Sequence, residues 1–136
     1  MATLVEDKSR DMELGDFNDL PMVASDTIFE GAAVGSNSGL ARPLQAGDPF
    51  MGFADYKVEN ELGAAGAERV RVLERGKIVL SVAGVTGNGD LGDEVYASDD
   101  DTFTLTVGSN SLIGKIVRYV SGTTVVVSFK AAHLAD

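Results

Sequence analysis

Histidine and cysteine, the side chains that most often bind metals or act as bases and nucleophiles near neutral pH, are almost absent from this chain of 136 residues. There is no cysteine, which excludes a disulfide framework, a thiolate metal site and a cysteine nucleophile. The single histidine is His133, the fourth residue from the end. A catalytic or ligating histidine is normally held by a partner side chain, so we interpret His133 as a solvated residue of the C-terminal tail.

Carboxylates are abundant, and they gather most densely in two segments with the composition of turns. Residues 88–94 place Asp90, Asp93 and Glu94 among glycines, but the spacing lacks the ligand register and closing glutamate of a calcium-binding loop. Residues 99–101 are three successive aspartates with no fixed ligand geometry. We interpret both segments as solvated acidic turns in preference to a structural calcium site. No pair of carboxylates is singled out for glycoside hydrolysis.

Other catalytic motifs are missing as well. No G-x-S-x-G nucleophile elbow occurs, and the glycine-rich segments lack the Gly-Lys-Ser/Thr sequence that completes a phosphate-binding loop. We therefore expect a protein that is not an enzyme and that uses no cofactor or metal.

Four basic side chains stand out in an otherwise acidic chain. Arg69 and Arg71 alternate with valines, and Arg75 and Lys77 follow at the start of the next alternating segment. They form either the solvated face of a hairpin or a patch that binds carboxylates of a partner, including the acidic N-terminal residues of a neighbouring copy. The formal net charge of −10 argues against a nucleic-acid partner, because phosphate binding depends on lysine and arginine.

Composition indicates one globular domain. A hydrophobic content of 44% and a mean hydropathy of +0.07 are typical of a chain that buries a core. No window approaches the roughly 18 consecutive apolar residues of a membrane span, and the N-terminus lacks a signal-peptide pattern. We expect no membrane partner and no Sec-dependent secretion.

Sixteen glycines, spread over the whole chain, favour short strands joined by tight turns over helices. The clearest strands, residues 68–73 and 77–82, alternate along the chain with a period of two. Eight or more such segments at nearly regular spacing predict an all-β fold, an antiparallel jelly-roll-like sandwich or barrel. The predicted strands are residues 27–29, 32–34, 40–44, 50–54, 56–59, 68–73, 77–82, 94–97, 103–107 and two arms of a C-terminal hairpin.

Residues 112–129 have the clearest pattern and predict a β-hairpin that turns at Ser121 and Gly122. In the first arm both faces are partly apolar. Either that strand is covered on both sides, or a bulge at Gly114 changes the alternation. The second arm alternates regularly, and its predicted core face consists of Thr123, Val125, Val127 and Phe129.

The first 24 residues differ from the rest, because acidic and apolar residues are interleaved at neither helical nor strand spacing. Three interpretations stay open: a frayed acidic terminus, an extended arm that docks on a partner, and a short amphipathic helix. We divide the chain into an extended N-terminal arm at 1–24, a β domain at 25–130 and a short tail at 131–136. The candidate partner-interface residues are Leu4, Met12, Leu14, Phe17 and Leu20 of the arm, together with Arg69, Arg71, Arg75 and Lys77.

Strand and turn motifs follow one another in a distinctive order between residues 47 and 129. The motifs are Gly47-Asp48-Pro49-Phe50-x-Gly52-Phe53, Arg69-Val70-Arg71-Val72, Gly76-x-Ile78-x-Leu80, Gly92-Asp93-x-Val95-Tyr96-Ala97-Ser98-Asp99-Asp100, Phe103-Thr104-Leu105-Thr106 and Ile113-Gly114-Lys115-Ile116-Val117. This series resembles the structural cement (capsid decoration) proteins of tailed phages. The resemblance implies a jelly-roll-like domain on the outer surface of the capsid of a virion, made in the bacterial host cytoplasm.

The resemblance also implies partners. It implies binding to the major capsid protein, with neighbouring subunits bridged, and association with other copies of the chain as a dimer or trimer. It implies no catalysis, and the interface residues named above are inferred from the sequence alone. The alternative is a tail or fibre accessory β module that binds a cell-surface carbohydrate or protein. Sugar stacking needs exposed aromatic rings, and the chain has no tryptophan and only Tyr56, Tyr96 and Tyr119 as tyrosines.

Overall fold

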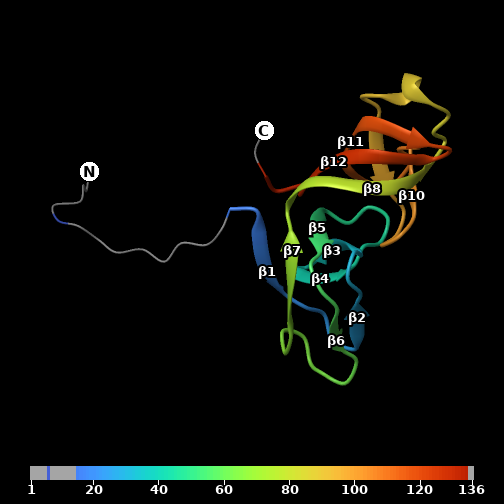
Figure 1. Ribbon diagram of the computed structural model, residues 1–136. Helices are drawn as coiled ribbons and strands as arrows, with labels where there is room; N and C mark the ends of the chain where they lie inside the picture. Colours follow the sequence, from blue (N-terminus) through green and yellow to red (C-terminus); the bar gives the residue numbers. More distant parts are fainter. Residues whose placement is uncertain (1–5, 7–14, 135–136) are drawn as a thin grey trace.

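The computed structural model describes residue 6 and residues 15–134, and Figure 1 shows two lobes built of strands. The lower lobe in that view holds the strands of the first half of the chain, and the upper lobe holds those of the second half. The predicted all-β class, with antiparallel sheets in a sandwich or barrel, is confirmed. The one helical segment among the described residues is a short 3-10 helix, η1, Asn88–Asp90.

A five-stranded antiparallel sheet forms the centre of the lower lobe, in the order β1-β7-β5-β3-β4. Just after β1, the N–H of Val23 donates to the carbonyl oxygen of Ala41 in β4 at 3.0 Å, so the two edges of the sheet approach each other. A separate pair, β2 with β6, completes the lobe. The strands are β1 Phe17–Pro21, β2 Asp26–Ile28, β3 Ala33–Asn37, β4 Leu40–Pro43, β5 Phe50–Ala54, β6 Val58–Asn60 and β7 Arg69–Leu73.

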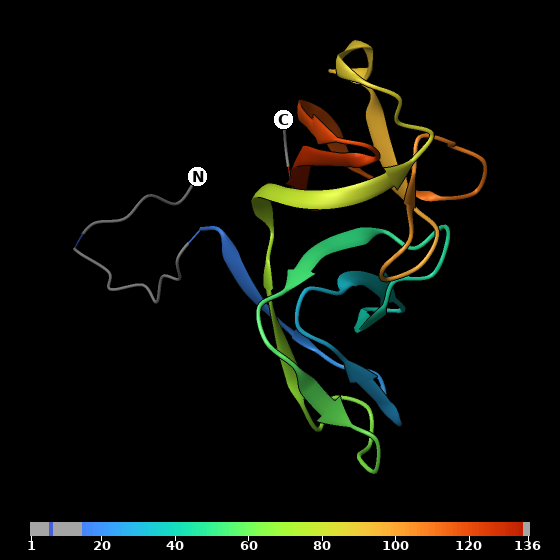
Figure 2. The same cartoon turned by 45° about the vertical axis from the view of Figure 1, so that its right-hand side comes forward.

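The upper lobe is a small closed barrel, seen from a second side in Figure 2, with the strand order β10-β8-β12-β11-β9. All neighbouring strands are antiparallel except β10, which runs parallel to β8. A closed barrel leaves no strand edge for another chain to pair with. The strands are β8 Arg75–Ala83, β9 Glu94–Ala97, β10 Phe103–Thr104, β11 Ser111–Ser121 and β12 Thr124–Lys130.

The five-stranded sheet has a hydrophobic core on each face, because successive side chains of a strand point to opposite sides. Ala33 and Phe53 pack into a core shared with the barrel, whereas Val34 and Ala54 pack into a second core on the other face. We call these the barrel core (Ala33, Leu44, Phe50, Phe53, Val82, Val85, Val95, Ala97, Phe103, Ile113, Ile116, Val125, Val127, Phe129) and the distal core (Met22, Ile28, Ala32, Val34, Ala41, Ala54, Val58, Val70, Val72).

Four phenylalanines join the sheet to the barrel. Phe53 of β5 lies with its ring centroid 4.8 Å from that of Phe129 in β12 and 6.1 Å from that of Phe103 in β10. Phe50 lies 5.3 Å from Phe53 and 6.2 Å from Phe129, and both contacts are edge-to-face. Edge-to-face aromatic pairs stabilise a core beyond the area that they bury, so this cluster is the main link between the lobes.

The C-terminal hairpin is confirmed, and β11 carries the irregularities that explain its mixed faces. Its pairing with β9 shifts register between Leu112 and Gly114, and its pairing with β12 shifts twice more. A Cβ at Gly114 would collide with the carbonyl oxygen of Ser128, so this position needs glycine for close strand contact. The bulges place the core-facing side chains three residues apart instead of two, at Ile113, Ile116 and Tyr119.

The strand predicted at 103–107 is shorter in the structure. β10 ends at Thr104, and the N–H of Thr106 then donates to the Thr104 hydroxyl at 3.1 Å. Asn110 closes the following turn through its N–H, which donates to the carbonyl oxygen of Val107 at 2.8 Å. A turn therefore takes the place of the last three predicted strand residues, and Val107 is exposed.

The boundary predicted between an arm at 1–24 and a domain at 25–130 is wrong for residues 17–24. Phe17–Pro21 form β1, which pairs with all five residues of β7, and Met22 is fully buried in the distal core. Phe17 and Leu20 therefore contact this chain's own sheet. The other three candidate arm residues, Leu4, Met12 and Leu14, lie outside the described residues.

Candidate interaction surfaces

The basic side chains of β7 contact β1 of the same chain. Arg69 donates from Nη2 to the backbone oxygen of Asp19 at 3.0 Å. The guanidinium of Arg71 lies 4.0 Å from the ring centroid of Phe17, a cation–π contact, and its Nε is 3.8 Å from Oδ2 of Asp55. The sequence predicted that these arginines meet carboxylates of a partner or line a solvated face. In the structure they meet acidic and aromatic residues of their own chain.

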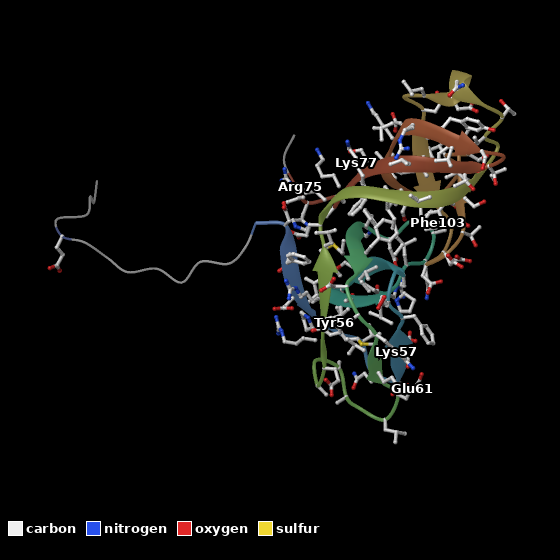
Figure 3. The ribbon with its side chains drawn as sticks, in the orientation of Figure 1. Tyr56, Lys57, Glu61, Arg75, Lys77 and Phe103 are labelled. Carbon is white, nitrogen blue, oxygen red and sulfur yellow. The ribbon has the colours of Figure 1, made fainter. Side chains whose placement is uncertain are left out.

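The basic side chains at the start of β8 differ from each other. Nε of Arg75 lies 3.7 Å from Oδ1 of Asp16, so Arg75 also contacts the segment that leads into β1. Lys77 is exposed and makes no ion pair with any described residue. Figure 3 shows both side chains near the bend between β7 and β8. Lys77 is therefore the one member of the predicted basic patch without a described acidic neighbour in the same chain.

His133 is not simply solvated, because it contacts a buried carboxylate. Nε2 of His133 lies 2.6 Å from Oε2 of Glu74, which also accepts a hydrogen bond from Nδ2 of Asn18 at 3.2 Å. Glu74 is only 5% exposed. The sequence offered no signal for this cluster, because its three members are far apart along the chain.

The backbone of Glu74 ties the same three segments together. Its N–H donates to the carbonyl oxygen of Asp16 at 2.7 Å, and its own carbonyl oxygen accepts from the N–H of Ala131 at 2.8 Å. The residues before β1 and the residues after β12 therefore meet at the β7–β8 bend. Glu74 is a structural junction that holds both ends of the folded chain.

The acidic segments act as turns closed by their own carboxylates. Oδ2 of Asp90 accepts from the N–H groups of Thr86 at 2.7 Å and Gly87 at 3.1 Å, and these bonds hold the pKa of Asp90 below its ordinary value. Oδ1 of Asp99 accepts from the N–H of Asp101 at 2.8 Å, which likewise lowers the pKa of Asp99. The neighbouring Asp100 behaves oppositely, because burial and the charges of Asp99 and Asp101 raise its pKa.

Asp48 makes the most enclosed ion pair described. Its two carboxylate oxygens accept from Nε and Nη2 of Arg42 at 2.9 and 2.8 Å, and Oδ2 also accepts from the N–H of Gln45 at 3.1 Å. Burial raises the pKa of Asp48, but the hydrogen bonds and the charge of Arg42 outweigh burial and lower it overall. Gly35 leaves the space that the carboxylate occupies. The pair fixes the loop between β4 and β5.

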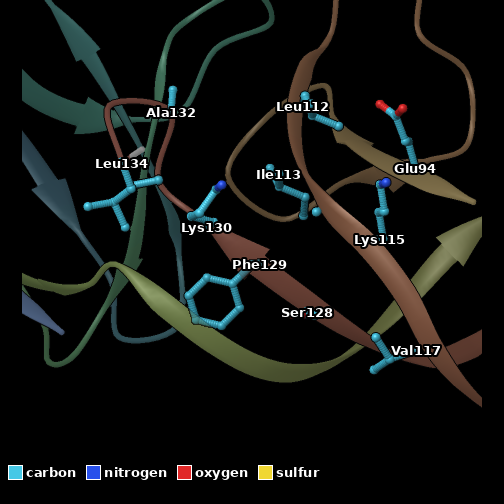
Figure 4. Close-up of a pocket in the computed structure, with 12 residues that line it drawn as sticks. Glu94, Leu112, Ile113, Lys115, Val117, Ser128, Phe129, Lys130, Ala132 and Leu134 are labelled. Carbon is cyan, nitrogen blue, oxygen red and sulfur yellow. The ribbon is translucent and has the colours of Figure 1, made fainter. Parts of the chain in front are cut away.

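A groove runs along the outside of the barrel between β11 and the segment after β12 (Figure 4), with a volume of about 710 Å³. Apolar side chains dominate its wall, and Leu112 is half exposed. Glu94, Lys115 and Lys130 bring charge to it. Its lining residues are Glu94, Leu112, Ile113, Gly114, Lys115, Val117, Ser128, Phe129, Lys130, Ala131, Ala132 and Leu134.

Three valines of the barrel strands are exposed, and one of them, Val117, also lines this groove. Val79 of β8 is 61% exposed and pairs with Val126 of β12, which in turn pairs with Arg118 of β11. Val117 and Val120 of β11 are also exposed, at the two register shifts. We call Val79, Val117 and Val120 the barrel valines. They give the outer wall of a closed barrel an apolar surface.

A second exposed apolar group lies at the opposite end of the molecule. Phe29 follows β2 and Tyr56 precedes β6, and both rings are exposed. Nζ of Lys57 lies 5.2 Å from the ring centroid of Phe29. Leu62, in the loop after β6, is fully exposed. Figure 3 shows Tyr56, Lys57 and Glu61 in this lower part of the lobe.

Clusters typical of metal or membrane chemistry are missing from the part of the chain that the structure describes. No three histidine, aspartate or glutamate side chains there converge as a metal site would require. No helix in this part is long and apolar enough to cross a membrane. The chain matches no protein-family model, no curated protein and no solved structure.

Proposed function

We propose that this chain is a structural cement protein that decorates the outer surface of a tailed-phage head and stabilises the major capsid protein lattice by bridging neighbouring subunits. The observation that carries the proposal is the set of barrel valines on a closed, edge-free barrel. These side chains are exposed one by one, and burying exposed apolar area against a partner contributes about 25 cal/mol per Å². The resemblance of residues 47–129 to decoration proteins suggests the major capsid protein as the partner.

The architecture supports adhesion through side-chain faces. Strand edges are closed in the barrel, so backbone pairing with a partner strand cannot start there, whereas the β2–β6 pair of the lower lobe keeps open edges. A partner of the barrel would therefore bind its outer wall through side chains. The net charge of −10 suits a protein on the outside of a DNA-filled shell, because it repels nucleic acid.

Lattice stabilisation follows from linkage. A protein that binds assembled capsid subunits but not separated ones shifts the equilibrium toward the shell by its binding free energy. Each copy needs to contribute only modestly, because the contribution is repeated at every equivalent site of an icosahedral shell.

Charge placed on the barrel valines should weaken binding to heads. For the double variant Val79→Asp with Val120→Asp we expect at least a tenfold rise in the dissociation constant for heads purified without the protein. A tenfold rise corresponds to a loss of about 1.4 kcal/mol of binding free energy. Both side chains are exposed in the isolated chain, so its thermal unfolding midpoint should stay nearly unchanged. Sedimentation with heads and imaging of decorated heads measure the effect.

The control is Leu62→Asp, an exposed apolar side chain at the other end of the molecule. It should bind heads as the wild-type chain does. If Leu62→Asp weakens binding while the valine variant does not, the orientation on the shell is the reverse of the one proposed. If the wild-type chain does not bind heads at all, the cement function is wrong.

Phe29 and Tyr56 favour a second candidate, a tail or fibre accessory module that binds a cell-surface carbohydrate or protein. Their exposed rings beside Lys57 offer an aromatic surface that the tyrosine positions alone did not predict. Binding of the wild-type chain to a glycan array, in place of binding to heads, would support this candidate.

A further inference from the structure

We propose that the outer wall of the barrel binds an acidic protein surface, in which carboxylates flank an apolar side chain. This inference rests on the proposed function, because it names the chemistry that the partner must present to the barrel. The wall consists of the outward-facing side chains of β8, β12 and β11, three neighbouring strands of the upper lobe (Figure 1). Its basic members, which we call the wall cations, are Arg75, Lys77, Lys115, Arg118 and Lys130.

These three strands concentrate positive charge. They hold five of the 11 lysines and arginines of the chain and none of its 21 aspartates and glutamates. The whole chain has a formal net charge of −10, so the wall has the opposite sign to the rest of the molecule. A surface that only needs to stay soluble mixes charges of both signs. A wall of one sign therefore indicates a partner of complementary charge.

Cross-strand register places the wall cations on one face of the sheet, because directly opposed residues share a face. Ser128 of β12 lies opposite Lys77 of β8 on one side and opposite Lys115 of β11 on the other. All three side chains are exposed, and Figure 4 shows Lys115 and Ser128 on their two strands. Neighbouring strands are spaced about 4.8 Å apart, so the backbones of the two lysines lie roughly 10 Å apart. One partner segment can therefore contact both charges.

The neighbouring rows along β12 add two more cations and an apolar side chain. On one side of the lysine row, Lys130 lies opposite Arg75. On the other side, Val126 lies between Val79 and Arg118. Val79 is 61% exposed. An apolar contact with charged groups at its border is the usual anatomy of a protein–protein interface, so this wall fits a partner with an apolar side chain among its carboxylates.

Three of the wall cations are not neutralised by the described part of their own chain. Lys77, Lys115 and Arg118 are exposed and form no ion pair with another described residue. Glu94 of β9 lies opposite Lys115 in the strand ladder, but its carboxylate accepts a hydrogen bond from the Tyr96 hydroxyl at 3.1 Å. These three charges are therefore available to carboxylates of a partner.

A nucleic acid fits the wall less well than a protein. Phosphate backbones bind to dense lysine and arginine, and the acidic remainder of this chain repels a polyanion. The exposed side chain of Val79 gains nothing from phosphate, whereas an apolar side chain of a protein can cover it. Charges at the border of such a contact speed association and exclude partners of the wrong sign.

Charge reversal within the wall tests the inference on heads purified without the protein. For Lys77→Glu with Lys115→Glu we expect at least about a tenfold rise in the dissociation constant at about 0.05 M salt. The difference from wild type should shrink below about threefold near 1 M salt, where the Debye length is about 3 Å. Sedimentation with heads measures both values, and circular dichroism checks that the variants are folded.

The matched control is Lys57→Glu with Arg69→Glu, which makes the same change of net charge at exposed residues of the lower lobe. Its affinity should stay within about threefold of wild type at both salt concentrations, because neither residue belongs to the wall. Equal affinities of wild type and the Lys77→Glu, Lys115→Glu variant at low salt would overturn the inference and leave the cement function in place.

Peptide probes test the wall without heads. Amide NMR spectra of the wild-type chain are recorded with a peptide of alternating glutamate and leucine, with one of alternating lysine and leucine, and with oligothymidine. We expect the signals of Lys77, Ser128 and Arg118 to shift with the glutamate peptide alone, even if heads are not bound, which would contradict only the cement function. Shifts with oligothymidine alone, or no shift with the glutamate peptide, would overturn the inference. Salt-sensitive self-association that charge reversal abolishes would also overturn it, because a second copy would then be the occupant.

Discussion

At the scale of single residues, the strand and turn motifs between residues 47 and 129 occupy structural positions. Asp48 holds Arg42 and the loop before β5, Phe50 and Phe53 fill the barrel core, and Gly114 allows β11 to lie close to β12. None of these residues is placed for catalysis. Their shared role is to fix the shape of the outer walls.

The Asp48–Arg42 pair predicts a specific loss of stability. Asp48→Asn removes the charged bidentate contact and should lower the free energy of unfolding by about 2 kcal/mol at pH 7. The folded-state pKa of Asp48 is lowered, so the carboxylate contributes stability above its unfolded pKa of about 3.9, and this contribution is lost as the pH falls through the folded value. The difference between the variant and the wild type should therefore shrink in acid, as measured by urea unfolding across pH.

Asp101→Asn is the control for this measurement, because Asp101 is exposed in a turn. It should change the free energy of unfolding by less than about 0.5 kcal/mol. An Asp48→Asn variant as stable as wild type at pH 7, or one whose deficit persists unchanged in acid, would contradict the role given to the pair.

At the scale of elements, β1 is the largest departure from the sequence-based division of the chain. Its residues mix acidic and apolar types because Phe17 and Leu20 pack on the sheet while Asp16 and Asp19 meet arginines. The pattern resembled a partner-binding arm, and the partner proves to be β7 of the same chain.

Two truncations should separate the strand from the residues before it. Removal of residues 1–24 deletes β1 and Met22 and uncovers Val70 and Val72. Each large apolar side chain withdrawn from the core costs about 1.5–3 kcal/mol, so we expect the thermal midpoint to fall by more than about 10 °C or cooperative unfolding to disappear. Circular dichroism during heating measures this.

Removal of residues 1–14 is the matched control, since it leaves β1 and Asp16 in place. Its midpoint should stay within a few degrees of that of the full chain. Equal midpoints for the two truncations would mean that residues 17–24 contribute nothing to the fold, against the observed pairing of β1 with β7.

At the scale of the whole molecule, the two lobes share one sheet. The barrel core uses one face of β3 and β5, and the distal core uses the other. If the shared sheet unfolds with one core, the other core is exposed to water as well. The two lobes should therefore unfold together.

This coupling predicts one transition for both lobes. Methyl NMR signals of Val70 in the distal core and Val125 in the barrel core should disappear at the same temperature. Phe53→Ala should lower that shared midpoint for both signals, with a loss of about 3–5 kcal/mol, although Val70 lies on the far side of the sheet. Val107→Ala, at an exposed valine, is the control. Separate midpoints for the two signals would show that the lobes unfold independently.

Local spacing was sufficient to predict the all-β class, the C-terminal hairpin and the core positions of Val125, Val127 and Phe129 in its second arm, but it was wrong for Thr123, which is exposed. Alternation with a period of two, and turns at residues such as Gly122, depend on neighbours in the chain. The same reasoning left β11 ambiguous, because a bulge moves side chains to the other face without a local signal beyond Gly114.

Only the tertiary structure decided the division into two cores, the place of β1 and the junction at Glu74. Asn18 and His133 each lie more than fifty residues from Glu74 along the chain, so no spacing could indicate that they share its carboxylate. The physical reason is that the spacing of apolar residues indicates which side chains are buried. Which strands and segments then pair depends on how surfaces from distant parts of the chain fit together. Composition indicated an acidic, helix-poor chain, whereas packing decided which strand faces are buried and which are exposed.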